Sequence, residues 1–172
     1  RVPLIVRWPS GIKAGQTTHA LACLTDFYAT MRDITGQPTE DRGGEDSFSL
    51  VPTFKGEAQT GRETLISHSI GGSFAIRLSN WKLCLSAGSG GWSAPREPDA
   101  RKQNLPLMQL FDLKGDRGER TNLIDEHPER VATLLRQLKK EVSQGRSTPG
   151  NPVSNDREVT FLPKGVSLPV RE

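Results

Sequence analysis

The sequence lacks long hydrophobic runs and carries no strong charge of either sign. No apolar stretch approaches the roughly 20 residues that a membrane-spanning helix needs, so we expect no membrane as partner. The 23 Lys and Arg residues are offset by 20 Asp and Glu residues, and no basic stripe is interleaved with aromatic residues. A nucleic-acid surface has such a stripe, so we expect no nucleic acid as partner.

Hydrophobic residues are also scarce, at 34% of the chain, against about 45–50% in typical globular proteins. The 17 Gly and 12 Pro residues favour many turns and few long elements. Such a lean composition suits a chain that buries one face against other polypeptide. The sequence also begins at Arg1, without Met and on a strand-like segment, which favours a fragment of a longer protein.

Cysteine is rare, with Cys23 and Cys84 as the two examples. A disulfide between them is allowed by number, but no spacing supports it. Unpaired buried thiols are the commoner case, and the alternative stays open.

The first third of the chain predicts the end of an α/β layer. Residues 2–8 form a short β-branched run flanked by prolines, which predicts a strand buried on both faces. Thr25 is the expected N-cap of a helix whose apolar residues recur at helical spacing up to Gly36, namely Phe27, Tyr28, Met31 and Ile34. A short helical turn is expected within residues 47–56. We assign residues 1–60 to this layer.

The middle of the chain predicts an antiparallel sheet of about four strands. Apolar residues alternate with polar ones, and the strand candidates are residues 64–69, 74–79, 81–86 and 107–113. Ser79 and Asn80 are expected to form a two-residue hairpin in which Asn80 takes a positive φ. Residues 88–105 are expected to form a long flexible loop.

A single long helix is expected at about residues 128–144. Pro128 suits its first position and Gly145 its end, and one apolar stripe runs along it: Val131, Leu134, Leu135, Leu138 and Val142. We assign residues 61–150 to a subdomain in which this helix covers the sheet. Residues 151–172 hold three further prolines and are expected to form an irregular tail.

Several segments resemble, in the usual order, the sulfatase family of the alkaline phosphatase superfamily, notably its bacterial arylsulfatase-like branch. They are residues 1–9, 24–36, 46–56, 74–83, 110–123 and 146–150, so the resemblance covers about residues 1–150. It implies an α/β (alkaline phosphatase-like) remnant followed by an α+β C-terminal subdomain. It further implies a C-terminal portion of an enzyme that hydrolyses sulfate monoesters.

The resemblance also implies a formylglycine nucleophile, made in a Cys/Ser-x-Pro-x-Arg pattern, and a calcium site. The pattern is absent here, because its nearest match begins at Ser93 and has Glu97 where Arg is required. We therefore expect no catalytic residue, metal ligand or cofactor in this chain, which alone should be inactive. Calcium and formylglycine are expected in the full-length enzyme, where an N-terminal catalytic domain is the partner and the substrate is a small-molecule or carbohydrate sulfate ester.

His68 and Trp92 are the candidate substrate-binding residues. His68 ends a strand beside a Gly-Gly turn, and its imidazole suits a sulfate oxygen or sugar hydroxyl; the alternative is a surface histidine bound to backbone. Trp92 follows two glycines, which suits a mobile lip against a sugar or aryl ring. The alternative for Trp92 is a side chain that pins the loop to the sheet.

Other charged residues favour structural roles. Arg77 and Lys82 are expected to be solvated strand charges, with attraction of an anionic ester as the alternative. His19 and His127 are expected to be structural. The turn that carries Asp112, Asp116 and Glu119 lacks the dense oxygen ligands that calcium requires, so we expect a structural corner.

Two other functions stay open at the level of sequence. One keeps the superfamily but hydrolyses a phosphodiester or phosphonate ester, and the other is a non-catalytic binding or scaffold module. A periplasmic or secreted location follows by analogy with the family alone.

Overall fold

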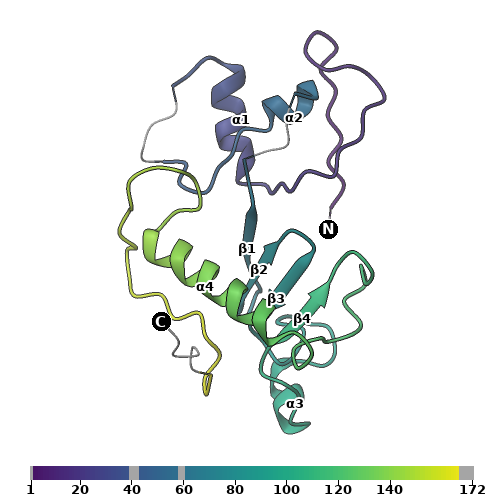
Figure 1. Cartoon of the computed structure of the whole chain (residues 1–172). Helices are drawn as coiled ribbons and strands as arrows, with labels where there is room; N and C mark the ends of the chain where they lie inside the picture. The colour runs from purple at the N-terminus through teal and green to yellow at the C-terminus, as the bar shows by residue number, and fades with distance from the viewer. Residues whose placement is uncertain (1, 39–42, 58–60, 167–172) are drawn as a thin grey trace. The chain divides into compact units, whose positions relative to one another are not determined.

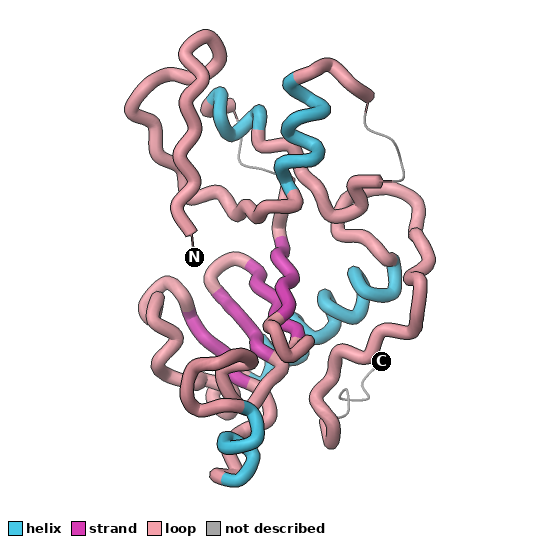
Figure 2. The backbone as a smooth tube through the Cα atoms, turned by 180° about the vertical axis from the view of Figure 1, so that it is seen from behind, coloured by secondary structure: helices cyan, strands magenta, loops and turns pink. Residues whose placement is uncertain are grey.

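The computed structural model describes residues 2–38, 43–57 and 61–166, which fall into two compact units. The first unit comprises residues 1–63 and 146–151, and the second comprises residues 64–145 and 152–172. Helices and strands are shown along the chain in Figure 1 and by type in Figure 2.

The first unit contains helices α1 (Asp26–Ile34) and α2 (Val51–Lys55). The predicted helices at these places are confirmed, but the predicted side-chain cap at Thr25 is wrong. The Thr25 hydroxyl donates to the Asp46 carbonyl at 3.2 Å. The carboxylate of Asp26 instead accepts from the Cys23 backbone N–H at 2.8 Å, so a residue inside the helix fixes the start of α1.

The strand predicted at residues 2–8 is wrong for the described chain. This segment forms no strand in the described chain, and the Ile5 side chain is 91% exposed. A strand that is buried on both faces needs neighbours for its hydrogen bonds and for its side chains. The described residues of this unit provide neither.

The predicted apolar stripe of α1 does not face the interior of its unit. Of the four predicted residues, Tyr28, Met31 and Ile34 are exposed and Phe27 is half-buried, whereas Asp26, Ala29 and Thr30 are buried. The Thr30 hydroxyl donates to the Asp26 carbonyl at 2.6 Å and accepts from the Leu50 N–H at 2.9 Å. Side-chain hydrogen bonds therefore hold much of this interior together.

The second unit contains the predicted four-stranded antiparallel sheet, which is confirmed. Its strands, in spatial order, are β1 (Thr64–His68), β2 (Phe74–Leu78), β3 (Trp81–Cys84) and β4 (Gln109–Asp112). Leu78 pairs with Trp81, so the two-residue hairpin is also confirmed. The positive φ, 54°, belongs to Ser79, the first hairpin residue, and not to Asn80 as predicted.

Helix α4 (Pro128–Gln144) covers one face of this sheet, as Figures 1 and 2 show. The predicted helix and its apolar stripe are confirmed. The buried cluster between helix and sheet comprises Phe74, Ile76, Leu83, Leu85, Leu110, Leu134, Leu135 and Leu138. Gly145 ends α4 in the left-handed region, with φ 63°.

The predicted long loop at residues 88–105 contains a short helix, α3 (Glu97–Lys102), so that prediction is wrong in part. Pro98 lies in its first turn, acidic residues begin it and basic residues end it, which suits the helix dipole. Ala100 is its buried residue. Because α3 has no apolar stripe, periodicity gave no sign of it.

Residues 152–166 form no helix or strand. Three of their side chains, Val159, Phe161 and Leu162, pack against the core of the second unit. The last six residues of the predicted irregular tail lie outside the described residues. Every helix of the described chain is too short or too polar to cross a membrane.

Candidate functional site

Two loops of the second unit meet at the end of the sheet where β1 turns into β2. One is the turn of residues 69–73, and the other is the glycine-rich segment of residues 86–96. The Gly71 N–H donates to the Gly90 carbonyl at 3.4 Å. Gly90 has φ 69°, and a Cβ on it would lie 2.9 Å from the Ser69 Cβ, so the close approach requires glycine.

The glycine-rich segment is anchored along its length. The Gly88 N–H donates to the Glu97 carboxylate at 2.9 Å, and the Gln109 side chain donates to the carbonyls of Ser86 and Gly88 at 3.0 and 2.9 Å. The Ser89 hydroxyl donates to the Ser93 carbonyl at 2.7 Å. These bonds anchor residues 86–89 to β4 and to the start of α3, while the mobile lip at Trp92 stays a prediction.

Trp92 lies at the outer side of this anchored segment. Its side chain is 76% exposed, so the alternative in which it pins the loop to the sheet is wrong. Arg96 is also exposed, and its Nε lies 3.4 Å from the Trp92 carbonyl oxygen. The Arg96 guanidinium therefore contacts the backbone of Trp92, four residues earlier in the same segment.

His68 is the last residue of β1 and is exposed. Its ring centroid lies 3.9 Å from that of Phe74, its partner in the strand register, and Phe74 belongs to the core. The imidazole is thus fixed on one side and open on the other. Because β1 leads directly into the turn that contacts Gly90, the structure brings His68 and Trp92 onto neighbouring segments.

Ile70 is a candidate that sequence reasoning missed. It lies between His68 and the Gly71–Gly72 pair, and its side chain is 72% exposed. A Cβ on Gly91 would lie 3.8 Å from the Ile70 Cγ2, so Ile70 adjoins the residue before Trp92. The sequence offered one signal for it: a large apolar residue stands in a turn that otherwise contains serine and glycine.

The basic strand residues are half-buried and have bonding partners, whereas solvated charges were predicted. The Arg77 Nε donates to the Ser79 carbonyl at 2.9 Å. The Lys82 ammonium pairs with the Glu119 carboxylate at 2.7 Å. His127 stands just before α4, its ring centroid 5.0 Å from that of Trp81, while His19 lies exposed in a loop.

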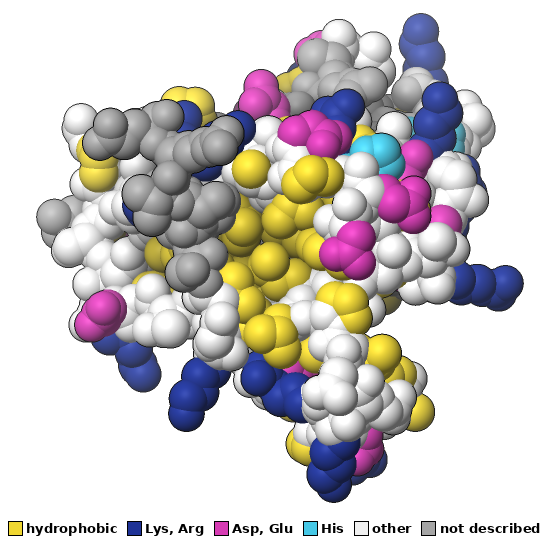
Figure 3. All heavy atoms as spheres, turned by 60° about the horizontal axis from the view of Figure 1, so that its bottom comes forward, with side chains coloured by type: hydrophobic (Ala, Val, Ile, Leu, Met, Phe, Trp, Pro, Cys, Tyr) yellow, Lys and Arg dark blue, Asp and Glu magenta, His cyan; other side chains and the backbone are white. Residues whose placement is uncertain are grey.

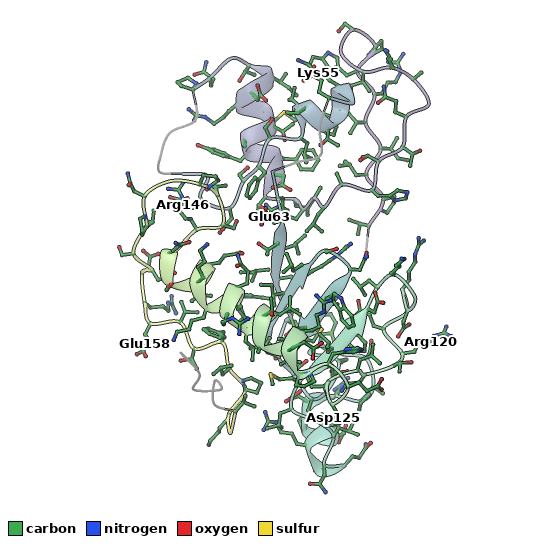
Figure 4. The ribbon with its side chains drawn as sticks, viewed as in Figure 1. Lys55, Glu63, Arg120, Asp125, Arg146 and Glu158 are labelled. Carbon is green, nitrogen blue, oxygen red and sulfur yellow. The ribbon has the colours of Figure 1, made fainter. Side chains whose placement is uncertain are left out.

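The acidic turn after β4 is a structural corner, as predicted. The Asp116 carboxylate accepts from the backbone N–H groups of Thr121 and Arg120 at 2.8 and 2.6 Å; Arg120 is labelled in Figure 4. These bonds lower the pKa of Asp116, that from Thr121 most. The Asp112 carboxylate accepts from the Lys114 N–H at 2.9 Å.

The residues present do not fit the nucleophile or the metal that the resemblance implies. No three His, Cys, Asp or Glu side chains gather to hold a metal ion within the described residues. Cys23 and Cys84 are free thiols, and burial raises the pKa of Cys84. Glu97, which stands where formylglycine formation needs Arg, is engaged with Gly88 and Arg101. Calcium and formylglycine remain expectations for a longer enzyme.

A hollow with a mixed polar and apolar lining adjoins the glycine-rich segment of the second unit. Figure 3 shows hydrophobic side chains gathered on the face that comes forward in that view. The hollow encloses about 210 Å³ and is lined by Ala87, Leu105, Pro106, Gln109, Asn122, Ile124 and Asp125. The side-chain oxygen of Asn122 accepts from the backbone N–H groups of Leu110 and Ile124, so this residue stabilises the turn between β4 and α4.

Comparison with known proteins finds sulfatases. No protein-family model matches the chain. The chain is 28% identical to an N-acetylgalactosamine-6-O-sulfatase of Bacteroides thetaiotaomicron, over 78% of this chain and 26% of that protein. It is 32% identical to human arylsulfatase K, over 80% of this chain and 25% of the relative. It is 31% identical to bovine arylsulfatase A, over 81% of this chain and 29% of the relative.

Solved structures give the same result. One, of a protein studied in the metabolism of multiple glycosaminoglycans by Bacteroides thetaiotaomicron, is 27% identical, with a TM-score of 0.63 over 79% of this chain and 28% of that one. A second solved structure is of a protein in complex with its substrate D-glucosamine-2-N,6-O-disulfate. It is 23% identical and shares the fold, with a TM-score of 0.60 over 81% of this chain and 28% of that one.

These matches agree with the four-stranded sheet and covering helix, which correspond to the C-terminal subdomain of the alkaline phosphatase-like fold. The chain spans about a quarter of the length of the curated relatives it matches, which is consistent with a C-terminal portion. By sequence and by fold, the chain belongs to the sulfatase family of the alkaline phosphatase superfamily.

Proposed function

We propose that this chain is the C-terminal part of an enzyme that hydrolyses sulfate monoesters. In that enzyme it supplies substrate-pocket walls and structural packing, and by itself it is inactive. The observation that carries this proposal is the similarity to sulfatases along about 80% of the chain, over only about a quarter of their length. The formylglycine nucleophile and the calcium ion would come from the N-terminal catalytic domain.

Exposed apolar groups of the first unit support a packing role. Ile5 is 91% exposed within an apolar segment. Leu24, just before α1, is 75% exposed, and Met31, within α1, is 50% exposed. Large exposed apolar groups mark an interaction surface, because covering them gains about 25 cal/mol per Å². The N-terminal catalytic domain is the proposed partner of both surfaces.

His68 and Trp92 are the proposed substrate contacts of the second unit. The ring nitrogens of His68 suit a sulfate oxygen or a sugar hydroxyl, because Phe74 holds one side of the ring and leaves the other open. Trp92 offers an exposed ring to the substrate. The names of the relatives favour a carbohydrate sulfate ester, since one is an N-acetylgalactosamine-6-O-sulfatase.

A chimera tests the proposal. This chain would replace the matching portion of the Bacteroides thetaiotaomicron N-acetylgalactosamine-6-O-sulfatase, and sulfate release from 6-O-sulfated N-acetylgalactosamine would be measured. We expect the chimera to turn over substrate, while this chain alone and the relative without its matching portion do not. The His68→Ala chimera should show a raised KM, with Arg77→Ala on the same sheet as the control.

Three outcomes would contradict the proposal. They are turnover by the isolated chain above the buffer rate, full activity of the shortened relative, and a chimera that unfolds cooperatively yet releases no sulfate. Faster hydrolysis by the chimera of a phosphodiester than of the sulfate ester would favour the alternative chemistry of the superfamily.

A further inference from the structure

Among the described residues of the second unit, the most exposed large apolar side chains lie on two loops that contact each other. Trp92 is 76% exposed and Ile70 is 72% exposed, whereas Leu105, the next in this unit, is 36% exposed. Each stands beside a glycine pair, and the pairs meet through the Gly71–Gly90 hydrogen bond. Two apolar groups this exposed on contacting loops need an explanation that isolated surface residues do not.

Both side chains are presented by backbone that is already fixed. The turn that carries Ile70 is closed by a 2.9 Å hydrogen bond from the Ser69 N–H to the Ser73 carbonyl, and the Ser69 hydroxyl accepts from the Ser73 N–H at 3.1 Å. The segment that carries Trp92 is held by Gln109 and Glu97. Little further ordering is therefore needed when a ligand binds, which favours affinity.

The size and chemistry of this surface suit a sugar ring. An indole face and an aliphatic group match the apolar C–H face of a pyranose, and the glycines beside them leave the approach open. Two side chains alone do not make a stable protein interface, which buries about 1,200–2,000 Å², so a small ligand is the better match. Arg96, exposed beside Trp92, adds a cation that attracts an anionic substituent on the ring.

We propose that Ile70 and Trp92 form a ledge that binds a saccharide ring, with Arg96 favouring rings that carry a sulfate or carboxylate group. The proposal rests on the proposed function and deepens it, because it assigns a sugar ring rather than an aryl group as the substrate feature that this part of the chain recognises. Ile70 is the additional specificity residue.

Calorimetric titration of the 172-residue chain tests the ledge directly. The probes are a disaccharide containing 6-O-sulfated N-acetylgalactosamine, the same disaccharide without sulfate, 4-nitrophenyl sulfate and inorganic sulfate. We expect saturable binding of the sulfated disaccharide, weakened about tenfold by Trp92→Ala and by Ile70→Ser, which corresponds to about 1.4 kcal/mol. Arg96→Gln should reduce the preference for the sulfated over the unsulfated disaccharide, and Leu105→Ala, the control, should bind like the parent chain.

The ledge is refuted if the chain does not bind the disaccharide, if Trp92→Ala and Ile70→Ser bind as well as the parent, or if 4-nitrophenyl sulfate binds as tightly. Circular dichroism of each variant shows whether the fold is kept. The chimera separates this proposal from the proposed function. An active chimera whose KM is unchanged by both ledge variants refutes the ledge alone, whereas a folded, inactive chimera with disaccharide binding refutes the enzyme role alone.

Discussion

Replacing Asp26 by Asn should unfold the first unit more than any single exposed substitution. Asp26 is fully buried, and its two carboxylate oxygens each accept from one backbone N–H and from the Arg62 guanidinium. The backbone donors are Cys23 and Phe48, at 2.8 and 3.0 Å, and the guanidinium contacts are 3.2 and 2.5 Å. One side chain thus joins the start of α1 to two other segments.

The expected loss follows from these bonds. An amide replaces one carboxylate oxygen by NH₂, so whichever oxygen is lost, one backbone N–H and one guanidinium N–H face a donor instead of an acceptor. The Arg62 charge, on a residue 7% exposed, also loses the charge of Asp26 opposite it. Breaking a buried pair in this way costs about 3–5 kcal/mol. A whole domain is stable by only about 5–15 kcal/mol, so the change is large.

Native-state hydrogen exchange measures this loss within the first unit. The Leu50 amide is a suitable reporter, because it is buried and donates to Thr30 rather than to Asp26. Asp33→Asn on the exposed side of α1 is the matched control and should cost at most about 1 kcal/mol. If Asp26→Asn lowers the protection of Leu50 no more than Asp33→Asn does, the reasoning about this buried pair is wrong.

Three further predictions concern the core, the end of α4 and acid titration. Leu138→Ala should cost about 2–5 kcal/mol in urea unfolding, because Leu138 is fully buried between helix and sheet. Gly145→Ala should destabilise by more than about 1 kcal/mol in the same assay, because φ is positive there and a Cβ would clash with the Val153 carbonyl. The Glu45 carboxyl should titrate near pH 2 by NMR, because N–H groups of Gly43, of Glu45 itself and of Gly44 lower its pKa from 4.5 to about 2. Since the folded pKa is the lower one, its contribution to stability is present above about pH 4.5 and is lost as the pH falls towards 2.

Each of these has a clear contrary result. A Leu138→Ala loss no larger than that of the exposed Lys139→Ala would mean that the helix does not pack on the sheet. An unchanged unfolding midpoint for Gly145→Ala would contradict the left-handed end of α4. A Glu45 titration near pH 4.5 would show that the backbone bonds do not form.

The second unit could be predicted closely from its sequence because local pattern and final packing agree. Leu134 and Leu138 lie on the helical stripe and in the observed core, and Ile76 and Leu83 alternate as strands require. A strict apolar period in a helix or strand places the apolar side chains on one face, so the pattern predicts which residues pack in the core. The Ser79 φ was harder to place, because Ser and Asn both suit a tight turn.

The first unit was predicted less well because its interior depends on specific long-range bonds. Nothing in the local sequence shows that Asp26 pairs with Arg62, 36 residues later. The apolar segment at residues 2–6 has the composition of a buried strand, yet its partners are not among the described residues. Composition therefore predicted burial, whereas the described chain leaves the segment exposed.

The substrate-binding role of the candidate residues stays a prediction, but their placement can be compared with the sequence. His68 and Trp92 were chosen for their chemistry beside glycine pairs, and the structure places them on neighbouring segments. Ile70 was missed, because an isoleucine in a turn has no chemical signature until its exposure and its neighbours are known.

Hydrogen exchange at residues 2–6, compared between the chain alone and the folded chimera, tests most directly whether this polypeptide completes a larger sulfatase. We predict fast exchange in the isolated chain and strong protection in the chimera, as the segment gains strand partners. Equally fast exchange in both would contradict the proposal that this segment packs against a catalytic domain.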